Sequence, residues 1–174
     1  MVPIAKPVVG GCEKSRVMEV LDSGMIASGS YVSEFEENFS RYCGARWGVA
    51  TTSGTSALCV ALKALGVGAG DHVLTTPFSF IATANSILYC GAKPVFADVQ
   101  ADSFNIDPVR VEEKLQEDDK ISTLLLVHLY GLPCEMDKLM KLVREYQLNL
   151  VEDCAQAHGA EFRGRRVGSF GDAS

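Results

Sequence analysis

The segment Ser53–Ser56 (Ser-Gly-Thr-Ser) has the composition of a phosphate-binding turn. It follows a predicted strand and opens a predicted helix, and a helix N-terminus offers free backbone N–H groups and a partial positive charge. Gly54 lets the backbone approach a ligand closely, while Thr55 and Ser56 add hydroxyl donors. An ordinary Ser/Thr helix cap explains the same residues, so both interpretations stay open. The spacing matches neither the P-loop nor the dinucleotide-binding glycine pattern.

A second segment, Pro77–Thr83, places aromatic side chains just after another predicted strand. An aromatic ring at the carboxyl end of a parallel sheet can stack on a flat cofactor ring. Burial of Phe78 and Phe80 in the core is the alternative, since aromatic side chains are so often buried.

A third segment, Leu148–Gly159, carries Asp153 at the end of an apolar run. A carboxylate at that place can hold a pyridine nitrogen protonated, which makes the ring an electron sink. A capping aspartate is the alternative, and a metal-binding acid is disfavoured because no P-loop precedes it. His158 fits a structural role better than a metal ligand, because no partner has a matching spacing.

The order of the three segments is more informative than any one of them. A phosphate turn, an aromatic side chain and an acid each follow a different strand. Because the carboxyl ends of parallel strands meet at one edge of a sheet, we expect all three to converge on a single cofactor.

The elements that must position these residues alternate between helices and strands from about residue 45, which is typical of a parallel α/β sheet. Two helices precede them, one from Glu13 to Ser23 and one over Val32–Tyr42 whose apolar side chains share a face. We expect strands at Trp47–Thr51, His72–Thr75, Pro94–Val99, Ser122–His128 and Leu148–Val151. We expect further helices at 55–65, Ile81–Cys90, Pro108–Gln116 and Met136–Tyr146.

The bulk composition excludes several classes of protein. With 174 residues, 47% hydrophobic and 22% charged, the chain is typical of a globular domain, and its net charge of −6 disfavours nucleic-acid binding. Six cysteines form no C-x-x-C pair, so neither a zinc site nor a disulfide framework is indicated. No signal peptide and no membrane span are recognisable, and we expect a cytoplasmic protein.

Several stretches together resemble one known family, the DegT/DnrJ/EryC/StrS sugar aminotransferases, which depend on pyridoxal 5'-phosphate (PLP). The matching stretches are Gly29–Glu36, Ser53–Leu58, Pro77–Asn85, His128–Gly131 with Pro133 and Met136–Asp137, Glu152–Gly159 and Gly168–Asp172. They cover nearly the whole chain in the family's order. The resemblance implies an aspartate-aminotransferase-like α/β fold (PLP transferase fold type I), with a mostly parallel sheet flanked by helices.

The resemblance also implies roles for individual residues. Gly54, Thr55 and Ser56 would bind the cofactor phosphate, and Phe80 would stack on the pyridine ring. Asp153 would pair with the ring nitrogen, and Gln156 would lie near the 3-hydroxyl group. No metal is implied. Family members transfer an amino group from an amino acid, usually glutamate, to a nucleotide-linked keto-sugar, and they act as homodimers.

By the same resemblance, residues 1–174 are the N-terminal part of the large cofactor-binding domain. A helical segment spans residues 1–44 and the α/β part spans 45–174, with the small C-terminal domain outside this sequence. The family's Schiff-base lysine follows the motif Gly168–Asp172 and lies beyond Ser174, so we expect these residues alone to be inactive. A related dehydratase with histidine at the lysine position, and a non-catalytic or regulatory fragment, are the alternatives.

Overall fold

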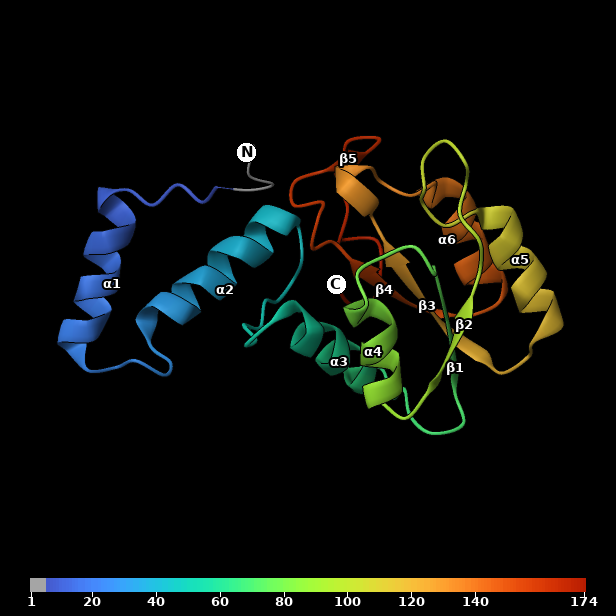
Figure 1. The fold of residues 1–174 in the computed structure, drawn as a ribbon, viewed down its shortest axis with the longest axis horizontal. Coiled ribbons are helices and arrows are strands. Elements are labelled where there is room, and N and C mark those ends of the chain that lie inside the picture. Colours follow the sequence, from blue (N-terminus) through green and yellow to red (C-terminus); the bar gives the residue numbers. More distant parts are fainter. Residues whose placement is uncertain (1–5) are drawn as a thin grey trace.

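The computed structural model describes residues 6–174 as an α/β unit preceded by two helices (Figure 1). The helices are α1 (Gly11–Ser23), α2 (Ser30–Cys43), α3 (Gly54–Ala64), α4 (Ala82–Tyr89), α5 (Pro108–Glu117) and α6 (Met136–Glu145), with a 3-10 turn, η1, at Leu129–Gly131. The strands are β1 (His72–Thr75), β2 (Lys93–Phe96), β3 (Ile121–Val127), β4 (Asn149–Asp153), β5 (Glu161–Phe162) and β6 (Arg165–Arg166). No helix within residues 6–174 is long and apolar enough to cross a membrane.

Four strands form one parallel sheet in the order β2-β1-β3-β4. Strands β5 and β6 form a separate antiparallel hairpin. Because all four strands of the main sheet run the same way, their carboxyl ends share one edge, as the helix–strand alternation predicted. The expected α/β fold with a parallel sheet flanked by helices is therefore confirmed.

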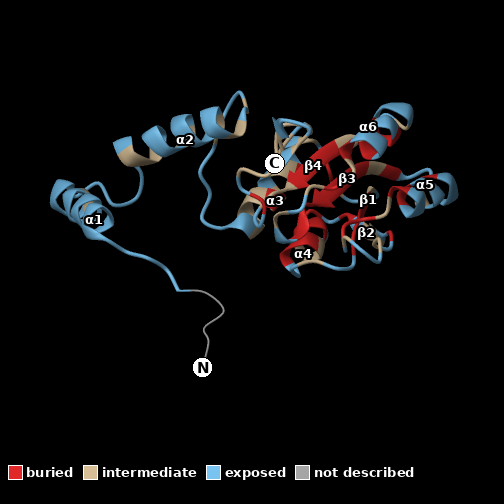
Figure 2. Cartoon of the chain, turned by 90° about the horizontal axis from the view of Figure 1, so that it is seen from above, coloured by how far each residue is buried: buried red, intermediate tan, exposed pale blue. Residues whose placement is uncertain are grey.

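Each face of the sheet packs against its own pair of helices. Leu124 and Leu126 of β3 belong to a core cluster with side chains of α5 and α6, whereas Leu125 belongs to a cluster with side chains of α3 and α4. This division follows from the strand geometry, in which successive side chains point to opposite faces. Figure 2 shows the buried residues concentrated in the strands and on the inner sides of these helices.

Replacing Leu124 with alanine is expected to lower the free energy of unfolding by about 2–5 kcal/mol, because the substitution leaves a cavity in the fully buried core. Urea denaturation of the protein that carries this sequence measures the loss. The control is Leu88→Ala on the exposed side of α4, for which we expect a change below about 0.5 kcal/mol. Equal losses for the two variants would contradict the assignment of the core.

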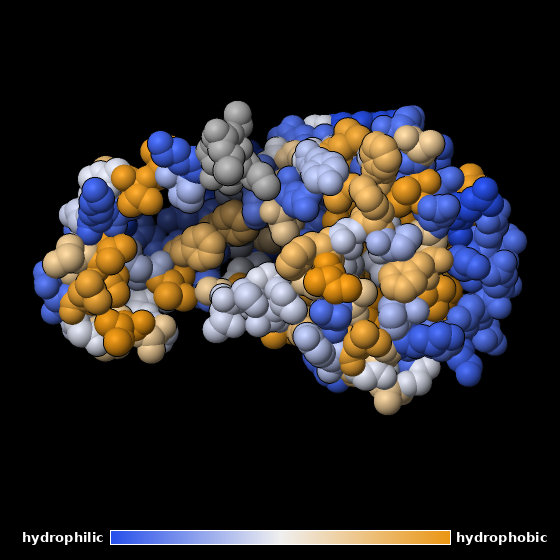
Figure 3. All heavy atoms as spheres, viewed as in Figure 1, coloured by the Kyte–Doolittle hydropathy of each residue, from blue (hydrophilic) through white to orange (hydrophobic). Residues whose placement is uncertain are grey.

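Helices α1 and α2 extend away from the sheet and bury no residue of their own (Figures 1 and 2). The apolar face predicted for the second helix is present, since the Phe35 and Phe39 rings stack at 5.3 Å and the Phe39 and Tyr42 rings at 6.3 Å. The Arg166 guanidinium lies over the Tyr42 ring and joins α2 to the hairpin. Figure 3 shows apolar side chains on the surface of this helical segment.

The strand expected at Trp47–Thr51 is absent, and this prediction was wrong. The segment is irregular, and Trp47 and Val49 are each 77% exposed. The Glu36 carboxylate of α2 accepts a hydrogen bond from the Ala50 N–H at 2.7 Å. This N–H group is therefore bonded to a helix side chain rather than to a neighbouring strand. A strand needs a neighbouring strand to pair with, and none of the strands described here borders these residues. The other predicted elements are confirmed, with shifts of a few residues at their ends.

Candidate active site

The predicted phosphate turn forms the first turn of α3. Ser53 is the N-cap, and its hydroxyl oxygen accepts a hydrogen bond from the Ser56 N–H at 3.1 Å. The Ser56 hydroxyl also lies 3.1 Å from the Thr52 hydroxyl and 3.0 Å from the Ser53 hydroxyl. A side chain at Gly54 would meet no atom within 4 Å, so the space in front of the turn is open. The cap and an accessible helix N-terminus are thus both present, and they do not exclude one another.

Asp153 is the last residue of β4. Its Oδ2 accepts a hydrogen bond from the hydroxyl of Thr83 in α4 at 3.2 Å, and its Oδ1 accepts one from the Ala155 N–H at 3.1 Å. Val151, two residues earlier, packs with the cluster under α3 and α4. Asp153 therefore lies on the α3/α4 side of the sheet, because residues two apart in a strand share a face.

Phe80 lies just before α4 and is 71% exposed, so it is not a core residue. Its carbonyl oxygen accepts a hydrogen bond from the Thr83 N–H at 3.1 Å, and Thr83 in turn contacts Asp153. Phe78 is about half exposed, and its ring lies 5.7 Å from that of Phe104. The structure thus connects the aromatic segment to the strand-end carboxylate through Thr83.

Helix α3 packs against both α4 and β4. The phosphate turn, the Phe80 segment and Asp153 therefore belong to elements that share one face of the sheet (Figure 1). The N-termini of the two helices and the carboxyl end of β4 face the same edge, because each helix runs antiparallel to the strands.

Gln156 is held by the turn that follows β3. Its Oε1 accepts a hydrogen bond from the Tyr130 N–H at 2.9 Å. This contact assigns the oxygen as the acceptor, so the side-chain NH₂ group is the one available to a ligand. Tyr130 adopts a positive φ of 53°, a backbone conformation uncommon for a residue with a side chain. His158 packs edge-on against Phe39 at 5.8 Å, in agreement with a structural role.

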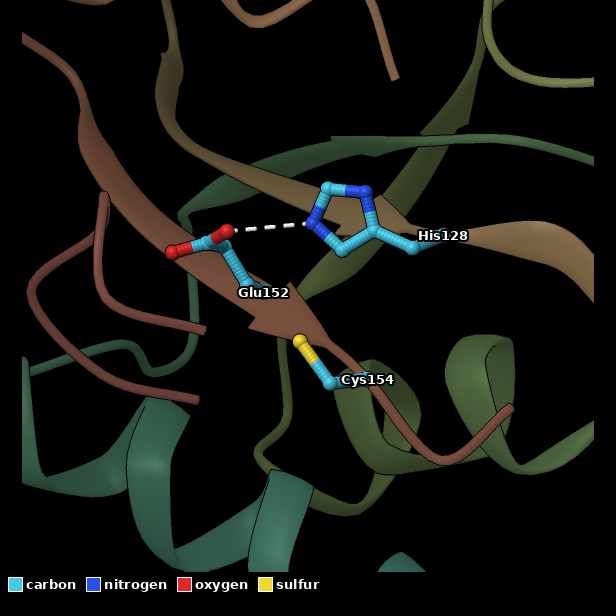
Figure 4. A group of neighbouring side chains, drawn as sticks. All are labelled: His128, Glu152 and Cys154. Atoms are coloured by element: carbon cyan, nitrogen blue, oxygen red, sulfur yellow. Dashed lines mark hydrogen bonds and ion pairs between the residues drawn. The ribbon is translucent and has the colours of Figure 1, made fainter. Parts of the chain in front are cut away.

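The sequence analysis missed a buried pair, His128 and Glu152, on the opposite side of the sheet from Asp153. The two side chains are fully buried, and the His128 Nε2 lies 3.0 Å from the Glu152 Oε2 (Figure 4). The His128 Nδ1 accepts a hydrogen bond from the Cys134 N–H at 3.1 Å, so Nε2 carries the proton and donates to Glu152. Two features of the sequence could have indicated this pair: Glu152 immediately precedes Asp153, and His128 directly follows the neighbouring strand.

Three backbone N–H groups complete the surroundings of Glu152. Gly168 donates to Oε2 at 2.9 Å, while Phe170 and Gly171 both donate to Oε1 at 2.7 Å. Burial by itself would raise the pKa of Glu152, but the hydrogen bonds from His128, Gly168 and Gly171 outweigh it and hold the pKa below the ordinary value of a glutamate. The carboxylate is therefore ionised at neutral pH.

His128, Glu152 and Cys154 lie within 4.8 Å of one another, as metal ligands do. Both nitrogens of His128 are already engaged, and the four lone-pair positions of Glu152 are filled by its four donors. Burial raises the pKa of the Cys154 thiol, which keeps it protonated. The cluster is therefore explained by hydrogen bonding, and we assign no metal to it.

The fold and this edge define an α/β protein whose parallel sheet carries a helix N-terminus, an exposed aromatic ring and a carboxylate near the carboxyl ends of its strands. The chain belongs to the DegT/DnrJ/EryC1/StrS aminotransferase family, whose model matches residues 9–174. The resemblance found in the sequence is thereby confirmed.

Curated relatives include GDP-perosamine synthase of Caulobacter vibrioides, which is 40% identical over 99% of this chain and 46% of its own length. The spore coat polysaccharide biosynthesis protein SpsC of Bacillus subtilis is also 40% identical, over 99% of this chain and 44% of its own length. The chain thus spans a little under half the length of these relatives.

Solved structures agree with the sequence matches. An aminotransferase from Psychrobacter cryohalolentis superimposes with a TM-score of 0.91 at 41% identity, over 97% of this chain and 43% of its own. The PLP form of a putative sugar aminotransferase from Streptococcus pneumoniae gives a TM-score of 0.93 at 30% identity, over 98% of this chain and 47% of its own.

Proposed function

We propose that the protein carrying this chain is a PLP-dependent aminotransferase that moves an amino group from an amino acid, glutamate in the first instance, to a ketone on a nucleotide-linked sugar. Membership of an aminotransferase family and relatives named for amino-sugar synthesis support the proposal. The observation that carries it is the Asp153 carboxylate, held by Thr83 on the side of the sheet where α3 and α4 present their N-termini.

The residues at this edge match the phosphate, the ring, the ring nitrogen and the 3-hydroxyl group of PLP in turn. The open N-terminus of α3 at Gly54, Thr55 and Ser56 suits a phosphate, because its free N–H groups and helix dipole favour an anion. The exposed ring of Phe80 suits a flat aromatic ring. A carboxylate suits a protonated pyridine nitrogen, and the available NH₂ group of Gln156 suits the 3-hydroxyl oxygen.

When bound, PLP supplies an electron-poor ring that accepts negative charge as the amino acid loses its α-proton. The residues of this chain contribute by orienting the ring and by stabilising its charge. The Asp153 carboxylate keeps a proton on the ring nitrogen, because an opposite charge in contact favours the protonated form. Thr83 and the Ala155 N–H fix the direction of that carboxylate. Phe80 shields one side of the ring site from water and sets its plane.

The family's lysine is part of this proposal, and we place it in the portion of the protein outside this sequence. Lys63 is the lysine of α3, but it lies in the last turn of that helix, away from the proposed phosphate site, and donates a hydrogen bond to the Cys90 carbonyl oxygen at 2.8 Å. Residues 1–174 alone are therefore expected to be inactive. The proposed division is a helical segment, 1–44, of which residues 1–5 lie outside the described residues, and a cofactor-binding part, 45–174.

A homodimer is also part of the proposal. Helices α1 and α2 bury none of their own residues and expose Val17, Leu21 and Phe35. A second copy of the chain would cover such apolar side chains.

Expression of the complete reading frame with PLP tests the proposed function. We expect a visible absorption band that the protein lacks without PLP, and this band should change when glutamate is added. Incubation with ¹⁵N-labelled glutamate and a set of GDP- and dTDP-linked keto-sugars should give a ¹⁵N-labelled sugar. Loss of a sugar hydroxyl without nitrogen incorporation would indicate a dehydratase instead, and a protein without any absorption change would contradict PLP binding.

A further inference from the structure

Glu152 gathers its donors from two regions that are distant in the sequence. His128 directly follows β3, and the N–H groups of Gly168, Phe170 and Gly171 come from the turn 168–171. An apolar side chain of similar size would fill the same space, so packing alone does not explain a buried carboxylate with four hydrogen-bond donors. We call Glu152, His128 and the turn 168–171 the Glu152 network.

The turn is shaped to reach the carboxylate. Gly168 has a φ of 86°, which favours glycine. A side chain at Gly171 would lie 2.5 Å from the Leu150 carbonyl oxygen, so only glycine allows the turn to approach β4 this closely. Backbone hydrogen bonds extend the contact, because the Asp172 N–H donates to the Leu150 carbonyl oxygen at 2.8 Å. The Glu152 N–H donates to the Ala173 carbonyl oxygen at 3.0 Å.

Glu152 and Asp153 are joined by one planar peptide, yet their side chains point to opposite faces of the sheet. On the other edge of β4 the pairing is continuous with β3, with Leu126 opposite Glu152 and Val127 opposite Asp153. Within residues 6–174 the Asp153 carboxylate accepts two hydrogen bonds, from Thr83 and Ala155, and the Asp153 carbonyl oxygen accepts one from the His128 N–H at 3.2 Å. The four charge-assisted bonds to Glu152 therefore add a side-chain restraint to the backbone pairing that holds the carboxyl end of this strand.

We infer that Glu152 is a positioning residue for the cofactor site. Its carboxylate ties the turn 168–171 and His128 to the end of β4 and so fixes the direction in which Asp153 faces the cofactor. The inference rests on the proposed function, since it concerns how the same site is held in shape.

The test is Glu152→Gln in the complete protein. The amide of glutamine is nearly the same size but presents an N–H₂ group toward backbone N–H donors, so part of the network is lost. We expect hydrogen–deuterium exchange of the segment 166–173 to accelerate at least about tenfold in the absence of PLP. We expect the Kd for PLP to rise about tenfold, because a misdirected Asp153 binds the ring nitrogen less well.

A matched control separates positioning from loss of stability. Leu142→Ala on α6 removes buried apolar volume on the same side of the sheet, and Leu142 supplies none of the four hydrogen bonds to Glu152. This variant should lower the Tm as Glu152→Gln does while leaving the Kd for PLP unchanged. Unchanged exchange in Glu152→Gln, or faster exchange with an unchanged Kd for PLP, would overturn the inference.

A second variant covers the case in which Glu152→Gln does not fold. His128→Gln keeps an N–H donor for Glu152 but loses the ring nitrogen that accepts from Cys134. Exchange of the segment 166–173 and the Kd for PLP should then both rise, by less than in Glu152→Gln, and a rise in exchange alone would refute the inference. A wild-type protein that binds no PLP would instead refute the proposed function, while the exchange measurement still tests the network.

Discussion

Replacing Asp153 with alanine in the complete protein is expected to lower kcat by roughly 10²- to 10³-fold, the range found when one preorganised electrostatic partner is removed from an active site. The reason is the loss of the Asp153 carboxylate, which lies at the carboxyl end of β4 on the α3/α4 side. Without it, the ring nitrogen of PLP loses its proton more easily and the ring accepts negative charge less well. Steady-state kinetics with glutamate and a keto-sugar nucleotide measures the effect.

Two further variants define what the Asp153 result means. Asp153→Asn keeps the shape and the contact with Thr83 but removes the charge, so it should lose nearly as much activity as Asp153→Ala. Asp102→Asn, at an exposed position in a turn, should retain wild-type turnover. If Asp153→Ala keeps its turnover, the role assigned to this carboxylate is wrong.

Thr55→Asp is expected to separate helix capping from phosphate binding, because the two roles respond to this change with opposite signs. Thr55 is the second residue of α3, where a negative charge stabilises the helix by about 0.3–1 kcal/mol through the helix dipole. The same charge repels a bound phosphate. Unit charges about 4 Å apart repel by roughly 1 kcal/mol in water and about 4 kcal/mol near a protein surface. The affinity for PLP should therefore fall by about 5- to 1,000-fold, as measured by equilibrium dialysis.

The matched control for Thr55→Asp is Val109→Asp in α5. Val109 occupies the same second position of its helix and is exposed, but it lies on the other side of the sheet from the proposed site. This variant should keep its affinity for PLP. Equal affinities in Thr55→Asp and the wild type would show that the turn is an ordinary helix cap.

Local sequence patterns predicted most of the fold. Apolar periodicity located α2, α3 and α6, and glycines marked where helices end, as at Gly44, which adopts a φ of 76°. The segment Trp47–Thr51 has the composition of a strand, but composition does not supply a neighbour to pair with. Its Ala50 N–H bonds to Glu36 of α2 instead, and no local pattern contains that contact.

The sequence by itself determined the class of fold and the three segments that we assign to the cofactor, because helix and strand periodicity and strand-end motifs are local properties of the chain. Only the tertiary structure decided that Phe80 is exposed, that Thr83 contacts Asp153, and that Glu152 is buried against His128. The physical reason is distance along the chain. These contacts join residues from 24 to 70 positions apart, and which partner satisfies a buried carboxylate depends on the packing of whole elements against one sheet.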